Sequence, residues 1–174
     1  AERPAGSTAA RGNAALTDDF ASIILTFRLS WPSLNNGTGN HARSINNGGT
    51  FTNTQVFNTQ SLPGMMVAVG PKDALQGGSV YVVTNSGDQF GSTFTFYQST
   101  NGGQSYTVKS TQQFAGYVGS MVSSRHSVQN MRTRPYPFLA CDNSWGPNRG
   151  RLYLVYASNY PAGNNNKPDI YCRY

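Results

Sequence analysis

The sequence predicts an all-β fold of short antiparallel strands, and three observations support this prediction. Among its 174 residues, 19 are Gly, 10 are Tyr and 9 are Phe, while only 11% are charged. Asn, Ser and Thr are also abundant, a composition typical of strands joined by tight turns. Short apolar runs recur between Gly, Asn and Pro. Residues 112–131 form the one stretch long enough for a helix, but Gly116 and Gly119 argue against a helix there.

The expected elements follow one another in a simple order. Residues 1–17, rich in Ala, Gly and Arg, are expected to form an extended or flexible arm before a folded part at residues 18–174. The apolar run 20–27 has the length and residue types of a buried strand. Six further runs form two meanders of three strands each, separated by turn residues. The first meander comprises residues 64–69, 78–84 and 92–97, and the second comprises residues 137–141, 150–156 and 169–174.

The two meanders are similar in sequence. The run GSVYVV at residues 78–83 aligns with GRLYLV at residues 150–155, a shift of about 72 residues. Part of this shift is a long connection that we expect at residues 113–134. The sequence therefore predicts an internal repeat.

One motif occurs twice with the pattern S-x-N-x-G-x-[ST]-aromatic, at residues 44–51 and 99–106. The Asn side chain in such a motif can accept a backbone N–H two residues later, and Gly supplies a positive φ. The hydroxyl groups can bond exposed backbone groups, and the aromatic ring can anchor the hairpin in the core. Two copies in one short chain indicate a repeated hairpin.

This motif resembles the Asp-box, S-x-D-x-G-x-T-W, of sialidase-type (BNR-repeat) β-propellers. The resemblance covers residues 18–174 and implies an incomplete β-propeller of four-stranded antiparallel blades, about two and a half in number, with Asp-box hairpins between third and fourth strands. Asn stands here where the family usually has Asp, and Phe51 and Tyr106 stand where it often has Trp. The resemblance implies a structural role for Ser44, Asn46, Gly48, Thr50, Phe51, Ser99, Asn101, Gly103, Ser105 and Tyr106.

Catalytic machinery is not apparent in the chain. Sialidases, as the resemblance implies, hold a carboxylate with three arginines, use a Tyr activated by a Glu as nucleophile, and use an Asp as acid and base. The only Glu is Glu2, in the expected arm. The sequence therefore favours a chain without catalytic residues and without a cofactor.

The segment 123–134 is the candidate ligand-binding region, because long loops on rigid scaffolds often bind ligands. Its basic side chains could contact an anionic glycan, although a structural role in bonding backbone carbonyls is the favoured alternative. Tyr117 and Trp145 could stack on sugar rings or pack their own loops. The candidate contacts are Arg125, His126, Arg132 and Arg134.

The two cysteines are expected to remain unbridged. Cys141 and Cys172 lie on the first and third strands of the second meander, and two inter-strand spacings amount to roughly 9–10 Å. A disulfide needs Cα atoms within roughly 7 Å. Neither Cys has a His at ligand spacing, and His41 and His126 are isolated in sequence, so no metal site is expected.

Three functions remain open from the sequence. The favoured hypothesis is a secreted, extracellular or cell-surface module that serves as a non-catalytic binding or assembly surface, with glycans as candidate ligands. The first alternative is a fragment of a sialidase-like glycoside hydrolase. The second is a subunit of an extracellular filament, because open blade edges expose unpaired backbone groups that seek further blades from the same polypeptide or from identical chains.

Other partners are disfavoured. The formal net charge of +6 reflects 7 acidic residues against 13 Lys and Arg rather than a dense basic patch, so nucleic acid is an unlikely partner. A mean hydropathy of -0.45 and the lack of a long apolar run argue against a membrane span. The chain begins with Ala1 rather than Met, as expected of a processed or excised chain.

Overall fold

The computed structural model describes residues 24–28, 39–44, 49–57, 62–71, 78–87, 91–115, 118–123, 125–133, 136–159 and 169–174. Within these ranges the chain forms strands and no helix. The predicted arm at residues 1–17 lies outside them. The strands are β1 (Ile24–Arg28), β2 (Gly39–Arg43), β3 (Thr52–Phe57), β4 (Leu62–Val69), β5 (Val80–Gly87), β6 (Gly91–Ser99), β7 (Thr107–Ala115), β8 (Ser120–Val122), β9 (Arg125–Val128), β10 (Met131–Arg132), β11 (Phe138–Cys141), β12 (Leu152–Ser158) and β13 (Asp169–Arg173).

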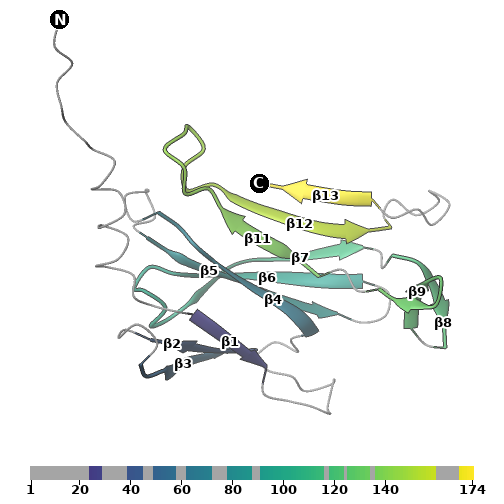
Figure 1. Ribbon diagram of the computed structural model, residues 1–174, viewed down its shortest axis with the longest axis horizontal. Coiled ribbons are helices and arrows are strands. Elements are labelled where there is room, and N and C mark those ends of the chain that lie inside the picture. Colours follow the sequence, from purple (N-terminus) through teal and green to yellow (C-terminus); the bar gives the residue numbers. More distant parts are fainter. Residues whose placement is uncertain are drawn as a thin grey trace, which may run out of the picture.

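These strands pair into four open sheets, and every pair is antiparallel. The strand orders are β1-β2-β3, β4-β5-β6-β7, β10-β9-β8 and β11-β12-β13, so each strand pairs with its neighbour in sequence (Figure 1). The all-β, antiparallel class predicted from the sequence is therefore confirmed.

Both predicted meanders are present. Strands β4, β5 and β6 match the first meander, and β11, β12 and β13 match the second. The first meander gains a fourth strand, β7, which pairs with β6 across the 99–106 hairpin. Of the predicted strand at residues 20–27, the described part is β1, which begins at Ile24.

The predicted long connection at residues 113–134 is wrong. Its first residues belong to β7, and strands β8, β9 and β10 within it form a small sheet. Positive φ angles at Ser123 (48°), Gln129 (48°) and Asn130 (66°) make the tight turns that join these strands. The sequence expectation missed these turns because only Asn130 is a usual left-handed residue.

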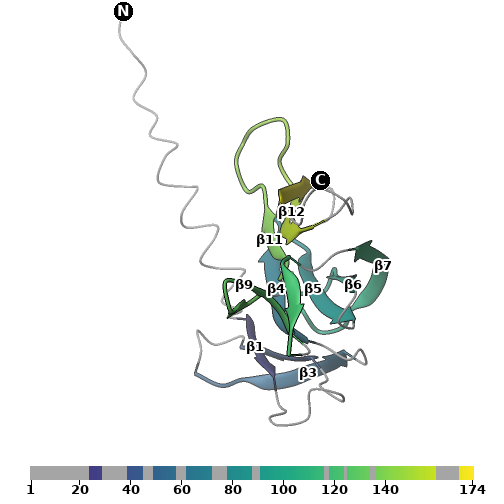
Figure 2. The same ribbon diagram turned by 90° about the vertical axis from the view of Figure 1, so that its right-hand side faces the viewer.

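Three of the sheets stand in a row, with β4–β7 in the middle. Figures 1 and 2 show β1–β3 on one side of this middle sheet and β11–β13 on the other. The chain therefore builds its core between sheets, in two separate layers.

One layer lies between β4–β7 and β1–β3. Val80, Val82 and Tyr97 of the middle sheet are buried there with Phe57 of β3. The ring centroids of Phe57 and Tyr97 are 4.5 Å apart. Tyr106, at the end of the 99–106 hairpin, completes this layer.

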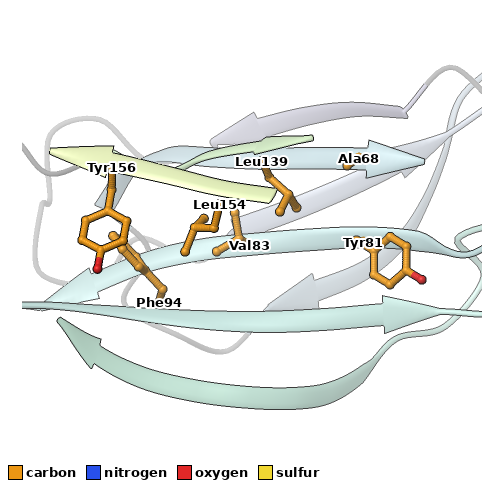
Figure 3. Close-up of a cluster of buried hydrophobic side chains, with 7 residues drawn as sticks. All are labelled: Ala68, Tyr81, Val83, Phe94, Leu139, Leu154 and Tyr156. Carbon is orange, nitrogen blue, oxygen red and sulfur yellow. The ribbon is translucent and has the colours of Figure 1, made fainter. Parts of the chain in front are cut away.

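The other layer lies between β4–β7 and β11–β12. Val83 and Phe94 of the middle sheet, both 0% exposed, meet Leu154 and Tyr156 of β12 (Figure 3). The rings of Phe94 and Tyr156 are edge to face, with centroids 5.4 Å apart. Full burial of such side chains stabilises the fold by roughly 1.5–3 kcal/mol each.

The two meanders also repeat in register. Val67 pairs with Val82 in β4–β5, and Leu139 pairs with Leu154, each 72 positions later, in β11–β12. We call the face of the middle sheet that carries Val80 and Val82 its front face, and the face that carries Tyr81 and Val83 its back face. By the same register, Leu152 and Leu154 lie on the front face of β11–β13, and Tyr153 and Val155 lie on its back face.

In both layers, the front face of the later sheet packs on the sheet that precedes it. The front face of β4–β7 meets β1–β3, and the front face of β11–β13 meets the back face of β4–β7. The shift of about 72 residues that the sequence predicted is therefore a repeat of both strands and interfaces.

Candidate functional site

The 99–106 hairpin is closed by hydrogen bonds within its own motif. The Ser99 hydroxyl accepts the Gly103 N–H at 2.8 Å and donates to Oδ1 of Asn101 at 2.8 Å. Asn101 Oδ1 also accepts the N–H groups of Gln104 and Ser105, at 3.1 and 3.0 Å. Its Nδ2 donates to the Ser105 hydroxyl at 2.8 Å. The Asn therefore bonds backbone groups three and four residues later, and not two residues later as the motif predicted.

Gly103 is required at its position on two grounds. Its φ of 82° lies in the left-handed region, and an added Cβ would approach His41 Cε1 to 3.0 Å and the Tyr106 hydroxyl to 3.2 Å. The hairpin is thus held tightly against the neighbouring sheet. Tyr106 is 8% exposed and belongs to the buried cluster between β4–β7 and β1–β3.

Tyr106 meets a buried histidine from the next sheet. The Tyr106 hydroxyl and His41 Nε2 are 3.2 Å apart and share a hydrogen bond, and their rings lie edge to face. His41 is fully buried, and this burial, together with the charge of the nearby Arg43, lowers its pKa from 6.5 to about 4. Burial also raises the pKa of Tyr106, while Arg43 opposes this. The pair is therefore neutral near pH 7 and serves to join β2 to the 99–106 hairpin.

The 44–51 hairpin differs from its counterpart. It joins β2 to β3, as 99–106 joins β6 to β7, and its Ser44 is 1% exposed. Its aromatic Phe51, however, is 39% exposed, and Thr50 is exposed. The prediction that this aromatic anchors the hairpin in the core is wrong, since Phe51 belongs to neither of the buried clusters of the described residues. Asn46 and Gly48 lie outside the described residues.

The predicted ligand contacts fall mainly on the small sheet. Arg125 and His126 belong to β9, and Arg132 belongs to β10, where it is exposed. His126 is half-buried and pairs with Met121 of β8. Arg134 and Tyr117 lie outside the described residues. The sheet brings two of the candidate residues close together, because Arg132 pairs with Ser127, the residue after His126, on the neighbouring strand.

Cys141 and Cys172 are both free. Cys141 pairs with Leu152 of β12 and Cys172 pairs with Val155, so β12 lies between the two cysteine-bearing strands, as the predicted strand order requires. Burial raises the pKa of the half-buried Cys141 thiol, with Asp142 adding to the shift and Arg149 opposing it. Cys172 is exposed on the other side of the sheet.

The loop from residues 142–151 holds an exposed tryptophan in a fixed place. Two backbone hydrogen bonds close the loop, from Asp142 N–H to the Arg151 carbonyl and from Gly150 N–H to the Asp142 carbonyl, both at 2.8 Å. The hydroxyl and the backbone N–H of Ser144 bond the Asp142 carboxylate and lower its pKa. Trp145 projects from this frame and is 80% exposed.

Arg149 supports the tryptophan from one side. Its Nη1 donates to the carbonyls of Asn143 and Ser144, at 2.8 and 2.6 Å, and its guanidinium lies 4.0 Å from the centre of the Trp145 ring. Asn143 in turn donates to the Val69 carbonyl of β4 at 3.1 Å. The loop is therefore tied to the middle sheet, and the indole packs against the Arg149 guanidinium on one side.

An exposed apolar face of β11–β13 is a further candidate site, and it was not predicted from the sequence. Strand alternation and register place a set of apolar residues on the back face of β11–β13, and we call this set the open face. Phe138 is 60% exposed there, Ile170 is 72% exposed and Tyr174 is 83% exposed. The guanidinium of Arg151 lies 5.0 Å from the centre of the Tyr174 ring and forms a charged rim. The open face comprises Phe138, Ala140, Tyr153, Val155, Ala157, Ile170, Cys172 and Tyr174.

A signal for the open face was present in the sequence. The runs FLAC, LYLVYA and IYC are apolar at odd and even positions alike, which is typical of a strand buried on both faces. The internal repeat pointed the same way, because Val155 aligns with Val83. Only the three-dimensional arrangement shows which of the two faces is covered.

Comparisons of the chain with protein-family models, curated proteins and solved structures found no match. Within the described ranges, no group of three or more His, Cys, Asp or Glu side chains is placed to hold a metal ion. The same part of the chain contains no helix that is long and apolar enough to cross a membrane.

Proposed function

We propose that the chain is a non-catalytic, extracellular assembly module whose sheets are blades of a β-propeller-like row, with a further sheet packing on the open face. The observation that carries this proposal is the exposure of Ile170. The register places Ile170 in β13 where Phe94 lies in β6, since Phe94 pairs with Asn85 and Ile170 pairs with Ala157, 72 positions later. Phe94 is 0% exposed, whereas Ile170 is 72% exposed.

Contiguity distinguishes the open face from ordinary surface residues. Single exposed apolar side chains are common on soluble proteins, but a contiguous apolar face marks an interaction site. The open face extends across all three strands of its sheet. Its counterpart on β4–β7 is covered by β11–β12, so the chain itself provides the example of what fits such a face.

The thiol of Cys172 reports directly on this proposal, because it lies on the open face. In the native protein carrying Cys141→Ala, we expect a maleimide to label Cys172 at least tenfold more slowly than in urea. Val108→Cys on β7 provides the control, since Val108 is 58% exposed and lies outside the open face. If Cys172 reacts as fast as the control thiol under every native condition, no sheet covers the face and the proposal fails.

Glycan binding is a second candidate function, favoured by Trp145. An 80% exposed indole offers one flat surface to a sugar ring, while Arg149 occupies the other surface. Titration of the intrinsic fluorescence with sialyllactose and with lactose tests this function. Quenching by either sugar that disappears in Trp145→Ala supports it, and an unchanged spectrum up to 10 mM sugar, about the limit of weak binding, excludes it.

A further inference from the structure

We propose that the open face is covered by a second copy of this chain, which docks its β1–β3 sheet there in a head-to-tail arrangement. This inference rests on the assembly function proposed above and adds the identity and orientation of the partner.

The first step is that the open face repeats a face already covered inside the chain. Val83, on the back of β4–β7, is 0% exposed and packs under β11–β12. Its equivalent Val155 is half-buried on the open face. Ala68 is 8% exposed, whereas Ala140 is exposed. At both of these equivalent positions, the side chain in β4–β7 is therefore less exposed than the side chain in β11–β13.

The second step fixes which face the partner must offer. In the layer between β4–β7 and β11–β13, a front face packs on the back face of the preceding sheet, and the 55-residue offset between the two motif copies assigns Ala42, like Tyr97, to the front face of its sheet. The open face is a back face, so the partner that repeats this geometry offers a front face.

The third step identifies that front face within a second copy. The front faces of β4–β7 and β11–β13 are already packed inside the chain. The remaining sheet of the row is β1–β3, at the end opposite to the open face (Figure 2). His41 of β2 points toward β4–β7, where it meets Tyr106, so the adjacent Ala42 lies on the far side. Ala42 is half-buried there and small enough for another sheet to approach.

Such a contact joins two different surfaces of the same chain. A heterologous contact of this kind continues from copy to copy and generates either a closed ring or an open filament. A two-fold dimer, by contrast, would press two open faces together. These two arrangements predict different responses to substitutions at the two ends of the row.

The test uses one charged substitution on each end. Ile170→Lys places an ammonium group on the open face, and Ala42→Lys places one on the far side of β1–β3. Burying an unpaired charge in an apolar contact should weaken association by roughly 100-fold or more. Val108→Lys on β7 is the matched control, because it adds the same charge at a site that is already 58% exposed. Circular dichroism and the urea midpoint establish that each variant is folded.

The expected result is specific to head-to-tail docking. Light scattering should give particles of several 18.8 kDa chains for the wild type and for Val108→Lys, and single chains for Ile170→Lys and for Ala42→Lys. Mixing the two end variants should restore a dimer and nothing larger, because each variant retains the one surface that the other has lost.

Other results overturn the inference in distinct ways. Self-association that Ala42→Lys leaves intact, together with Cys172–Cys172 cross-links after mild oxidation of the Cys141→Ala protein, would establish the two-fold dimer instead. A monomeric particle whose Cys172 is nonetheless protected would mean that the same polypeptide covers the face, so the second copy would be wrong and the assembly function would stand. A monomer with a freely reactive Cys172 would remove both.

Discussion

The sheets β4–β7 and β11–β13 are repeats of one another, yet only the first is covered on both faces. Phe94 and Ile170 occupy the same register position, and they are 0% and 72% exposed. The difference does not arise from residue type, because both are large and apolar. It arises from what stands next to each sheet, which teaches that burial in this molecule is a property of the row and not of the single sheet.

The largest effect is expected when the two equivalent positions are truncated in parallel. Phe94→Ala should lower the free energy of unfolding by about 3–5 kcal/mol, because it leaves a cavity between two packed sheets. Ile170→Ala should cost less than about 1 kcal/mol in the monomer, since that side chain is largely hydrated. Urea unfolding at low protein concentration measures both. Equal losses would show that Ile170 is covered within a single chain.

The free energy of unfolding should depend on pH through His41, which packs against the front face of the middle sheet. The folded-state pKa of His41 is about 4, below the 6.5 of an unperturbed His, so the unfolded chain binds this proton more readily. The free energy of unfolding should keep its full value above pH 6.5, fall by about 3 kcal/mol between pH 6.5 and 4, and lose nothing more through His41 below pH 4.

Urea midpoints across this pH range test the prediction. The decrease should largely disappear in His41→Gln, which has no proton to gain. His126→Gln leaves His41 in place and is the matched control. A decrease of the same size in His41→Gln as in the wild type would assign it to other groups.

A smaller effect is expected at the 99–106 hairpin, which contains the second copy of the motif. Asn101→Ala removes the acceptor of three hydrogen bonds, from the Ser99 hydroxyl and from the backbone of Gln104 and Ser105. We expect a loss of about 1–2 kcal/mol. Asn101→Asp keeps these acceptors and should stay within about 0.5 kcal/mol of the wild type. Thermal unfolding distinguishes them, and an equally damaging Asp would mean that the Nδ2 donor to Ser105 matters most.

The smallest effect on stability is expected in the loop at residues 142–151, between β11 and β12. Trp145→Ala removes a side chain that is 80% exposed, so the unfolding free energy should change by less than about 0.5 kcal/mol. Arg149 keeps its bonds to the carbonyls of Asn143 and Ser144 in this variant. A larger loss would show that the indole itself organises the loop, which would weaken the case for a ligand-binding role.

The sequence predicted much of the strand structure because its signals are local. Apolar runs separated by turn residues located both meanders, and the 72-residue shift predicted their repeat correctly. The 99–106 motif predicted a closed hairpin with its aromatic in the core, and Tyr106 is 8% exposed. The bond pattern of Asn101 differed in detail, because Gly102 and Gly103 both have positive φ and bring later N–H groups within reach.

The failures share a physical cause, since each depended on contacts between distant segments. Phe51 satisfies the motif as well as Tyr106 does, but only Tyr106 has a neighbouring sheet to pack against, and Phe51 is 39% exposed. His41 is isolated in sequence and becomes important only through Tyr106, which is 65 residues away. The alternation of β12 fits a strand buried on both faces, but it does not reveal which face lacks a neighbour.

The complementarity of front and back faces has an evolutionary consequence. A sheet whose two surfaces fit one another already contains the interface needed for its own copy. Tandem duplication of the corresponding gene segment would then lengthen the row without requiring any new contact to arise by mutation. The 72-residue spacing between β4–β5 and β11–β12 is the kind of record that such a duplication leaves, and the number of sheets would be free to vary between descendants.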